Sequence, residues 1–296
     1  MVHYQECPVC ASKEIEALLP VKDHSVSGEE FMIWQCKKCG LRFTQDVPDE
    51  NSIGRYYESA DYISHTNTSR GLVNQLYRKI RTYTLEQKAK LVMQNTVEKG
   101  RILDMGAGIG AFLHTMKSKG WEVTGIEPDE GARTQAINLF RLELFDKASM
   151  WQLQQESFDA ITLWHVLEHV HQLHAYVEQL KKVLKPKGKI FLALPNYQSW
   201  DSTIYKLHWA AYDVPRHLYH FSPQSLSILM EKHGLRVTQK KPMWFDSFYI
   251  SLLSSKYKNG KTNWIGAAWN GLLSNARALA DKDRCSSVIY VVEKTQ

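Results

Sequence analysis

The chain has 296 residues, of which 44% are hydrophobic and 23% are charged. At about 100–200 residues per domain, this length fits one large domain with a small appendage, or two ordinary domains. The aromatic content of 11% supplies enough apolar surface for a sizeable core, which excludes wholesale disorder. No apolar run approaches the ~20 residues of a membrane-spanning helix, and residues 1–10 lack the apolar centre of a signal peptide. We therefore expect a cytoplasmic protein.

The net charge of +6 is unevenly distributed along the chain. Between residues 70 and 101 there are eight basic side chains and two acidic ones. A basic helix can attract nucleic acid. Apolar side chains at helical spacing in the same stretch instead favour a helix with one solvated face and one face on a core. These side chains are Leu72, Val73, Leu76, Tyr77, Ile80 and Tyr83. We therefore expect the partner to be a small molecule and not a nucleic acid.

Four of the five cysteines form two Cys-x-x-Cys pairs near the N-terminus: Cys7 with Cys10, and Cys36 with Cys39. Two residues between the thiols let both sulfurs face one ion, and two such pairs complete a tetrahedral shell of thiolates. Zinc is the expected ion, iron in a rubredoxin-like site is the competing metal, and a reducing compartment disfavours disulfides. Because no ligand position is left open for water, we expect the metal to be structural.

In chain order, we expect a zinc-ribbon module at 1–45, a connector or lid at 46–69, and a main domain at 70–296. Within the main domain, strands alternate with helices. The expected strands are 101–104, 121–126, 158–164 and 189–194, and the helices between them are 110–119, 131–139 and 174–184. A helix at 223–233, strands at 235–240 and 287–292, and a helical insertion around 245–284 complete the chain. Alternation of this kind predicts an α/β fold, a doubly wound parallel sheet with helices on both faces.

The first strand of the main domain ends in a glycine-rich turn, Asp104-Met-Gly106-Ala-Gly108-Ile-Gly110. Glycines here let the backbone approach a ligand and open a helix with free N–H groups. The same glycines satisfy a dinucleotide-binding pattern, and Glu127 stands where its ribose-binding acid belongs, so a nicotinamide-dependent oxidoreductase is one candidate. Asp104 favours a ligand that carries positive charge, because its carboxylate would repel a pyrophosphate.

The glycine-rich turn is one of five short motifs that follow one another along residues 75–240. In the combination of these motifs the chain resembles the class I S-adenosylmethionine-dependent methyltransferases. The motifs are the glycine turn 104–110, Val-Thr-Gly-Ile-Glu-Pro at 123–128, Phe-Asp-x-Ile at 158–161, Val-Leu-Glu-His-Val at 166–170 and Leu-Lys-Pro-Lys-Gly at 184–188. The resemblance implies a Rossmann-like, seven-stranded sheet. It also implies S-adenosylmethionine as cofactor and S-adenosylhomocysteine as product.

The resemblance implies a role for each residue at the strand ends. Asp104 would lie near the methionine amino group, Glu127 would accept hydrogen bonds from both ribose hydroxyls, and Pro128 would lie beside the adenine. Trp164 and His165 would border the sulfonium, which an aromatic face stabilises by cation–π attraction. The residues expected to bind the cofactor are Asp104, Gly106, Ala107, Gly108, Gly110, Glu127, Pro128, Trp164 and His165.

A loop rich in titratable and aromatic side chains follows the strand at 189–194, at the sheet edge where such folds bind ligands. The ribbon and this loop are partly similar to zinc-binding sugar C-methyltransferases, which carry a Glu-His pair where this chain has Arg216-His217. We expect His217 to be the general base or to orient the acceptor, and Arg216 to hold an anionic group. Tyr212 and His220 are the alternatives for the same role.

The expected activity is methyl transfer from S-adenosylmethionine to an oxygen or carbon nucleophile of a small molecule, such as a sugar or another biosynthetic intermediate. Two other functions stay open at this point. One is the nicotinamide-dependent oxidoreductase. The other is an RNA-directed methyltransferase or nucleic-acid-binding protein that would use the ribbon and the basic helix.

Overall fold

The computed structural model describes residues 1–58, 72–96 and 99–295, and within the helix that begins at residue 72 it describes side chains from residue 79 onward. Only 46–58 of the predicted connector 46–69 therefore falls within the described residues. The apolar side chains predicted between Leu72 and Tyr77 lie outside them. No helix in the described part of the chain is long and apolar enough to cross a membrane.

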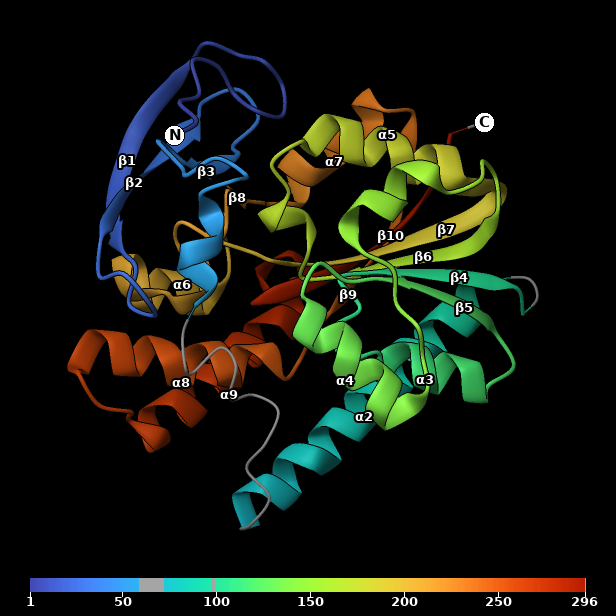
Figure 1. Cartoon of the computed structure of the whole chain (residues 1–296). Helices are drawn as coiled ribbons and strands as arrows, with labels where there is room; N and C mark the ends of the chain where they lie inside the picture. Colours follow the sequence, from blue (N-terminus) through green and yellow to red (C-terminus); the bar gives the residue numbers. More distant parts are fainter. Residues whose placement is uncertain (59–71, 97–98, 296) are drawn as a thin grey trace.

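A doubly wound α/β sheet forms the larger part of the molecule (Figure 1). Its strand order is β5-β4-β6-β7-β10-β9. The strands are β4 (Arg101–Met105), β5 (Glu122–Ile126), β6 (Phe158–Trp164), β7 (Leu184–Pro195), β9 (Leu235–Pro242) and β10 (Ser287–Lys294). The first four run parallel, and β10 runs antiparallel to both of its neighbours. The predicted fold class is thus confirmed.

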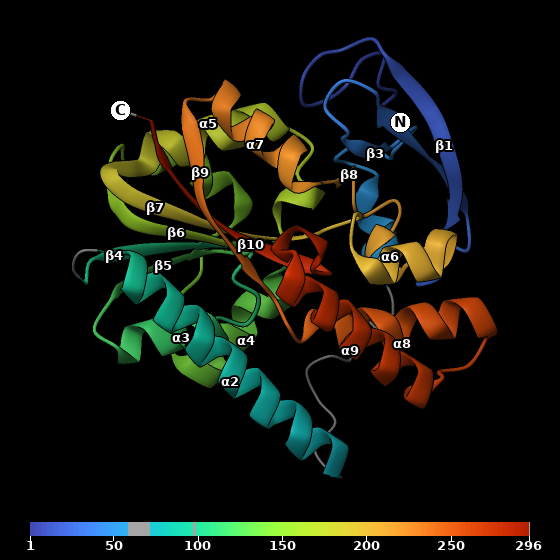
Figure 2. The same cartoon turned by 180° about the vertical axis from the view of Figure 1, so that it is seen from behind.

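Helices cover both faces of this sheet, as the alternating sequence pattern predicts. One face carries α2 (Leu72–Asn95), α3 (Ala111–Ser118) and α4 (Glu130–Phe140), and the other carries α5 (Leu173–Val183) and α7 (Pro223–Lys232) (Figures 1 and 2). Residues 288–292 of β10 are buried, because a central strand of such a sheet packs helices on both sides.

The sheet has six strands where seven were expected. The seventh position, beside β5, is reduced to an isolated bridge between Ile126 and Phe145. The segment leading to this bridge is short and largely irregular, and Phe145 itself is half exposed. An edge strand with so little buried surface gains little from extending its ladder.

A second, four-stranded sheet is formed mainly by the N-terminal segment that carries the cysteine pairs, of which Cys36 ends a strand. Its strands are β1 (Ile15–Lys22), β2 (Glu30–Cys36), β3 (Arg42–Thr44) and β8 (Tyr219–His220). The fourth strand comes from the aromatic loop of the main domain, through the pairs Phe43 with Tyr219 and Arg42 with His220. The ribbon is therefore joined to the main domain by backbone hydrogen bonds as well as by packing.

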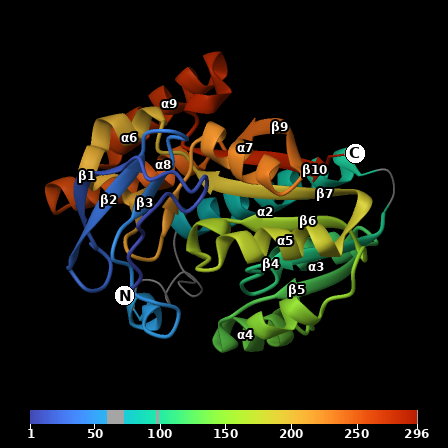
Figure 3. The same ribbon diagram turned by 90° about the horizontal axis from the view of Figure 1, so that it is seen from above.

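The predicted helical insertion is present as α8 (Asp246–Asn259) and α9 (Trp264–Ala280), which lie side by side beneath the ribbon sheet (Figures 1 and 2). The buried carboxylate of Asp201, in α6 (Trp200–Tyr205), connects the insertion to the loop. It accepts hydrogen bonds from Trp209 Nε1 at 2.8 Å, Ser274 Oγ at 2.9 Å and Ser286 Oγ at 2.7 Å. Seen from above, β7 points toward the side of the molecule that carries the ribbon and the insertion (Figure 3).

Candidate functional site

The four cysteines of the two pairs converge on one point. Cys7 Sγ lies 3.5 Å from Cys39 Sγ, Cys10 Sγ lies 3.6 Å from Cys36 Sγ, and all four sulfurs are within 4.8 Å of one another. In a tetrahedral zinc site with Zn–S bonds of about 2.3 Å, neighbouring sulfurs are about 3.8 Å apart. The predicted metal-binding cluster is therefore formed, and its donor set and spacing fit structural zinc.

The glycine turn after β4 uses backbone conformations that L side chains rarely adopt. Gly106, Gly108 and Gly110 have φ angles of +65°, +53° and +77°. A Cβ on Gly106 would meet Val166 Cγ2 at 2.6 Å, whereas a Cβ on Gly108 would meet nothing within 4 Å. The turn is thus packed against the protein at Gly106 and open at Gly108, which is where a ligand can approach the backbone.

Asp104, at the end of β4, is a buried carboxyl group. It accepts a hydrogen bond from Thr162 Oγ1 at 2.5 Å. Burial raises the pKa of Asp104 to about 7, against the lowering effects of the Thr162 hydrogen bond and of the Lys88 ammonium. This carboxyl group can therefore change its charge near neutral pH when a cation binds beside it.

Glu127 follows β5 and is held by two backbone amides. Its Oε2 accepts from the N–H of Gly108 at 2.7 Å, and its Oε1 accepts from the N–H of Asp129 at 2.9 Å. Burial raises its pKa. Arg133 Nη1 donates to the carbonyl oxygens of Glu127 and Pro128, which fixes the path of this turn. Each carboxylate oxygen keeps a lone pair for a hydroxyl donor.

Trp164 is the last residue of β6 and His165 follows it, and their side chains contact different residues. The ammonium of Lys88, from α2, lies 4.4 Å from the centroid of the Trp164 ring, and Phe112 packs edge-on against the same ring. His165 Nε2 lies 3.0 Å from Asp246 Oδ2 at the start of α8. Although burial opposes its charged form, the neighbouring Asp246 and Glu168 carboxylates raise the pKa of His165 to about 9. One face of the Trp164 ring is thus occupied by Lys88.

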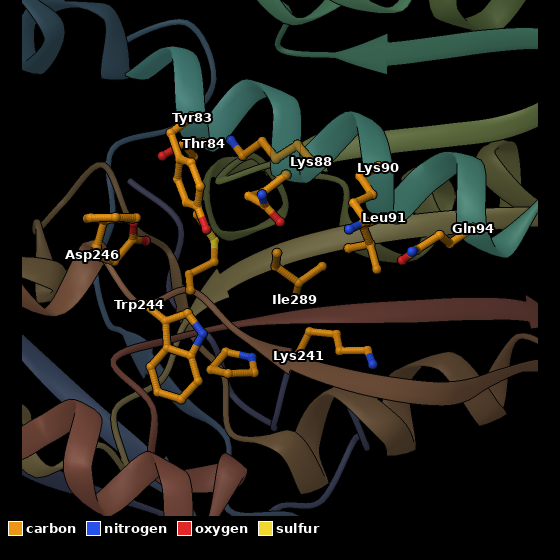
Figure 4. A pocket seen from close by; sticks show the side chains of 14 residues that line it. Tyr83, Thr84, Lys88, Lys90, Leu91, Gln94, Lys241, Trp244, Asp246 and Ile289 are labelled. Atoms are coloured by element: carbon orange, nitrogen blue, oxygen red, sulfur yellow. The ribbon is translucent and has the colours of Figure 1, made fainter. Parts of the chain in front are cut away.

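A cavity of about 360 Å³ lies between α2, the segment 241–246 and β10. Figure 4 shows Tyr83, Lys88 and Leu91 of α2 on one side, facing Trp244 and Ile289 on the other. Lys88 and Asp246 line it, and both also contact residues at the end of β6. Burial lowers the pKa of Lys88, while Asp246 and Asp104 favour its charged form.

Sequence reasoning missed both Lys88 and Asp246 as site residues. Lys88 is one of several lysines and arginines on a basic helix, and Asp246 begins a helix of the insertion. Neither carries a local motif that marks it.

Three of the four predicted catalytic residues have side-chain partners in the N-terminal ribbon. Arg216 is 1% exposed and donates to Asp213, Asp23 and the carbonyl oxygen of Tyr56. Tyr212 accepts from Arg42 Nη1 at 2.9 Å. His220 Nε2 lies 3.1 Å from Thr44 Oγ1, and burial with the nearby His217 holds its pKa well below the usual value. This geometry favours roles in joining the ribbon, the loop and the sheet.

His217 has a different environment, beside two residues that follow β6. One ligand atom each of Glu168, His169 and His217 lies within 4.8 Å of the other two. The rings of His169 and His217 are 4.6 Å apart between centroids, at 78° to each other. Burial lowers the pKa of His169 to about 4, so this ring is neutral at physiological pH. Of the four predicted catalytic side chains, His217 is the one that lies in this group with Glu168 and His169.

Together, the doubly wound sheet, the acidic residue before a glycine turn on its first strand and the second acidic residue after the next strand define a class I S-adenosylmethionine-dependent methyltransferase. Residues 77–240 match the family described as methyltransferase domain, and the chain belongs to this family. The predicted enzyme class and the predicted cofactor, S-adenosylmethionine, are thereby confirmed. The nicotinamide-dependent alternative is set aside.

Similar proteins include ubiquinone biosynthesis O-methyltransferases. That of Idiomarina loihiensis is 29% identical over 173 residues, which cover 53% of this chain and 70% of the relative. The human mitochondrial protein is 28% identical over 164 residues, 50% of this chain and 44% of the relative. The chain thus spans less than half the length of the human relative.

Among solved structures, a Galdieria sulphuraria protein named for sarcosine dimethylglycine methyltransferase shares the fold, with a TM-score of 0.52 at 13% identity. The alignment covers 74% of this chain and 88% of that one.

Proposed function

We propose that this enzyme transfers a methyl group from S-adenosylmethionine to a hydroxyl oxygen of a small-molecule acceptor. Its similarity to ubiquinone biosynthesis O-methyltransferases supports oxygen as the nucleophile. The main support for the position of the cofactor site is the free space beside Gly108, where an added Cβ would meet no atom within 4 Å. The N–H of Gly108 donates a hydrogen bond to Glu127, which orients this part of the turn. At the same edge of the sheet, Asp104 and Lys88 carry opposite charges when both are ionised, as do the ammonium and carboxylate of the methionine portion of the cofactor.

We assign the remaining cofactor contacts to the same edge of the sheet. Gly106, Ala107 and Gly110 shape the turn, and Glu127 with Pro128 receives the ribose and adenine portion. Trp164 and His165 border the reacting end. When bound, the cofactor supplies a methyl group on a sulfonium, which an acceptor oxygen takes with its own electron pair while the C–S electrons return to sulfur. The protein holds the two reactants in line and excludes water.

The acceptor oxygen must lose its proton as the O–C bond forms, and we assign its activation to His217. His217 is 8% exposed, and it faces His169 and Glu168 beside the end of β6. Tyr212, Arg216 and His220 position the loop that carries it.

Replacing His217 with alanine should lower turnover ~100-fold or more, the usual scale for losing such a group. Affinity for S-adenosylhomocysteine should stay unchanged, because the glycine turn lies outside this cluster. The assay is mass spectrometry of products from hydroxylated aromatic acceptors, with a nucleotide-linked keto-sugar as the comparison. Methylation of the keto-sugar carbon alone would contradict oxygen as the nucleophile. Wild-type turnover in His217→Ala, together with loss in His220→Ala, would move the role to His220.

A further inference from the structure

A second group of metal-ligating side chains lies just beyond the end of β6, separate from the four cysteines. Glu168 and His169 belong to the short 3-10 helix η4 (Leu167–His169), and His217 precedes β8. The backbone N–H of Leu218 donates to the carbonyl oxygen of Glu168 at 2.8 Å. This bond holds the two segments side by side, and it keeps one ligand atom of each residue within 4.8 Å of the others.

Glu168 is buried without a hydrogen-bond partner for its carboxylate. Its side chain is 1% exposed, and neither Oε1 nor Oε2 accepts a hydrogen bond. His165 Nδ1 stands 3.4 Å from Oε1, outside hydrogen-bond geometry, and it shares its charge with Asp246. Glu168 thus has an ion-pair neighbour in His165 but no hydrogen bond to either carboxylate oxygen, so its oxygens remain available to a metal ion.

Both histidines have Nδ1 beside a backbone carbonyl oxygen, which leaves Nε2 as the nitrogen available to a metal ion. Nδ1 of His169 lies 3.0 Å from the carbonyl oxygen of Arg216, and Nδ1 of His217 lies 2.9 Å from the carbonyl oxygen of Ala211. A carbonyl oxygen only accepts, so each Nδ1 carries the proton and each neutral ring keeps its lone pair on Nε2. Metal-ligating histidines are oriented in this way, by donating the second ring N–H to a carbonyl or carboxylate.

We propose that Glu168, His169 and His217 bind one divalent transition-metal ion. Two imidazole nitrogens and one carboxylate oxygen suit zinc or a neighbouring first-row metal, whereas magnesium and calcium prefer ligand sets made of oxygen. Three protein ligands leave a coordination position open, in contrast to the closed four-thiolate cluster. Asp213, whose Oδ2 is 3.9 Å from His217 Nε2, adds negative charge beside the site while it pairs with Arg216.

The open coordination position indicates what the ion does and which acceptors it suits. This part of the proposal rests on the proposed function. A hydroxyl oxygen bound to such an ion loses its proton more readily, as metal-bound water does. An acceptor with two neighbouring oxygen atoms would bind through both, which would fix the hydroxyl that is methylated. His217 then acts as a metal ligand rather than as a free base, and the proton that the bound hydroxyl loses passes to bulk water before the oxygen takes the methyl group.

The stoichiometry of zinc in the full-length protein tests the site directly. After zinc loading and gel filtration, plasma mass spectrometry should give two zinc ions per wild-type chain. Glu168→Gln and His217→Gln should each retain one, because the cysteine cluster is intact. His171→Gln is the matched control, since His171 Nε2 faces the carbonyl oxygen of Pro48 and should leave both ions bound. One ion per wild-type chain, or two in both variants, would overturn the proposal.

Cobalt absorption distinguishes the two sites in the same samples. Cobalt in the cysteine cluster gives intense thiolate charge-transfer bands, whereas the nitrogen–oxygen site adds only weaker visible bands. The weaker bands should be lost in Glu168→Gln while the thiolate bands persist, and their persistence in that variant would overturn the assignment. Neither measurement uses cofactor or acceptor. Two ions in a protein that fails to bind S-adenosylhomocysteine would therefore refute the proposed function and leave the metal site standing.

Discussion

Two glycines of the turn after β4 share a left-handed backbone but differ in what surrounds them. A Cβ on Gly106 would strike Val166 Cγ2, and a Cβ on Gly108 would project into open space. Gly106 is thus required by the packing of the protein itself. Gly108 is required by the strain of its backbone and, on our account, by the cofactor.

Alanine at these two positions should separate stability from binding. Gly106→Ala should lower the unfolding free energy by about 2 kcal/mol or more, because the stiff Val166 side chain must move. Gly108→Ala should cost about 1 kcal/mol, the strain of the left-handed backbone alone, while lowering S-adenosylhomocysteine affinity at least ~10-fold. Urea unfolding and calorimetry measure the two effects. Unchanged affinity in Gly108→Ala would show that the cofactor approaches elsewhere.

Asp104 should make cofactor binding depend on pH near neutrality. Burial raises its pKa to about 7 in the free protein, so the carboxyl group is neutral below that pH. Binding the cofactor's ammonium requires the ionised form, and affinity should therefore fall as the pH drops through about 7, by up to ~10-fold per unit. Calorimetry with S-adenosylhomocysteine from pH 5.5 to 8.5 measures this slope. The Asp104→Asn variant should bind S-adenosylhomocysteine weakly, and its affinity should no longer depend on pH in this range. The same pH dependence in that variant would show that another group is responsible.

At the scale of elements, the ribbon is connected through β3 and β8 to the loop that carries His217. Thr44 Oγ1 donates to the carbonyl oxygen of His217 at 2.7 Å, and Phe43 pairs with Tyr219. Loss of the metal from the cysteine cluster should therefore displace His217. It should leave the glycine turn in place, because that turn belongs to the other sheet.

Cys36→Ser should remove the ribbon zinc, lower the midpoint of thermal unfolding by several degrees and reduce turnover. S-adenosylhomocysteine affinity should change less than ~3-fold, because the cofactor edge is formed by β4, β5 and β6. Cys285→Ser is the control, since this buried thiol lies outside the cluster. Full zinc content in Cys36→Ser, or equal loss of cofactor affinity and turnover, would contradict this division of roles.

The sequence predicts most elements of the main sheet because each has its own pattern of apolar residues and ends in its own turn. The four-cysteine cluster is equally local, since two short motifs contain every ligand. β8 could not be predicted in this way. It has only two residues, too few for an alternating pattern, and its partner β3 lies more than 170 residues away. The reduced seventh strand depends on edge packing, which the apolar pattern of 141–145 does not reveal.

At the scale of the whole molecule, the predicted cofactor residues come together because they follow consecutive parallel strands. Asp104, Glu127 and Trp164 lie at or directly after the carboxyl ends of β4, β5 and β6, and the carboxyl ends of parallel strands meet at one edge. Lys88 and Asp246 reach this edge through the docking of a helix and of the insertion, which depends on packing over long separations. The group formed by Glu168, His169 and His217 likewise depends on contacts between residues far apart in the sequence, here the pairing of β3 in the ribbon with β8 in the loop.

Calorimetric titration of the full chain with S-adenosylhomocysteine, and in parallel with NADH and NADPH, tests the central claim most directly. We expect one S-adenosylhomocysteine bound per chain and no heat from either nicotinamide. Glu127→Gln, which keeps the size of the side chain but replaces one acceptor oxygen, should weaken this binding by about 1–3 kcal/mol. Binding of a nicotinamide without S-adenosylhomocysteine, or full affinity in Glu127→Gln, would contradict it.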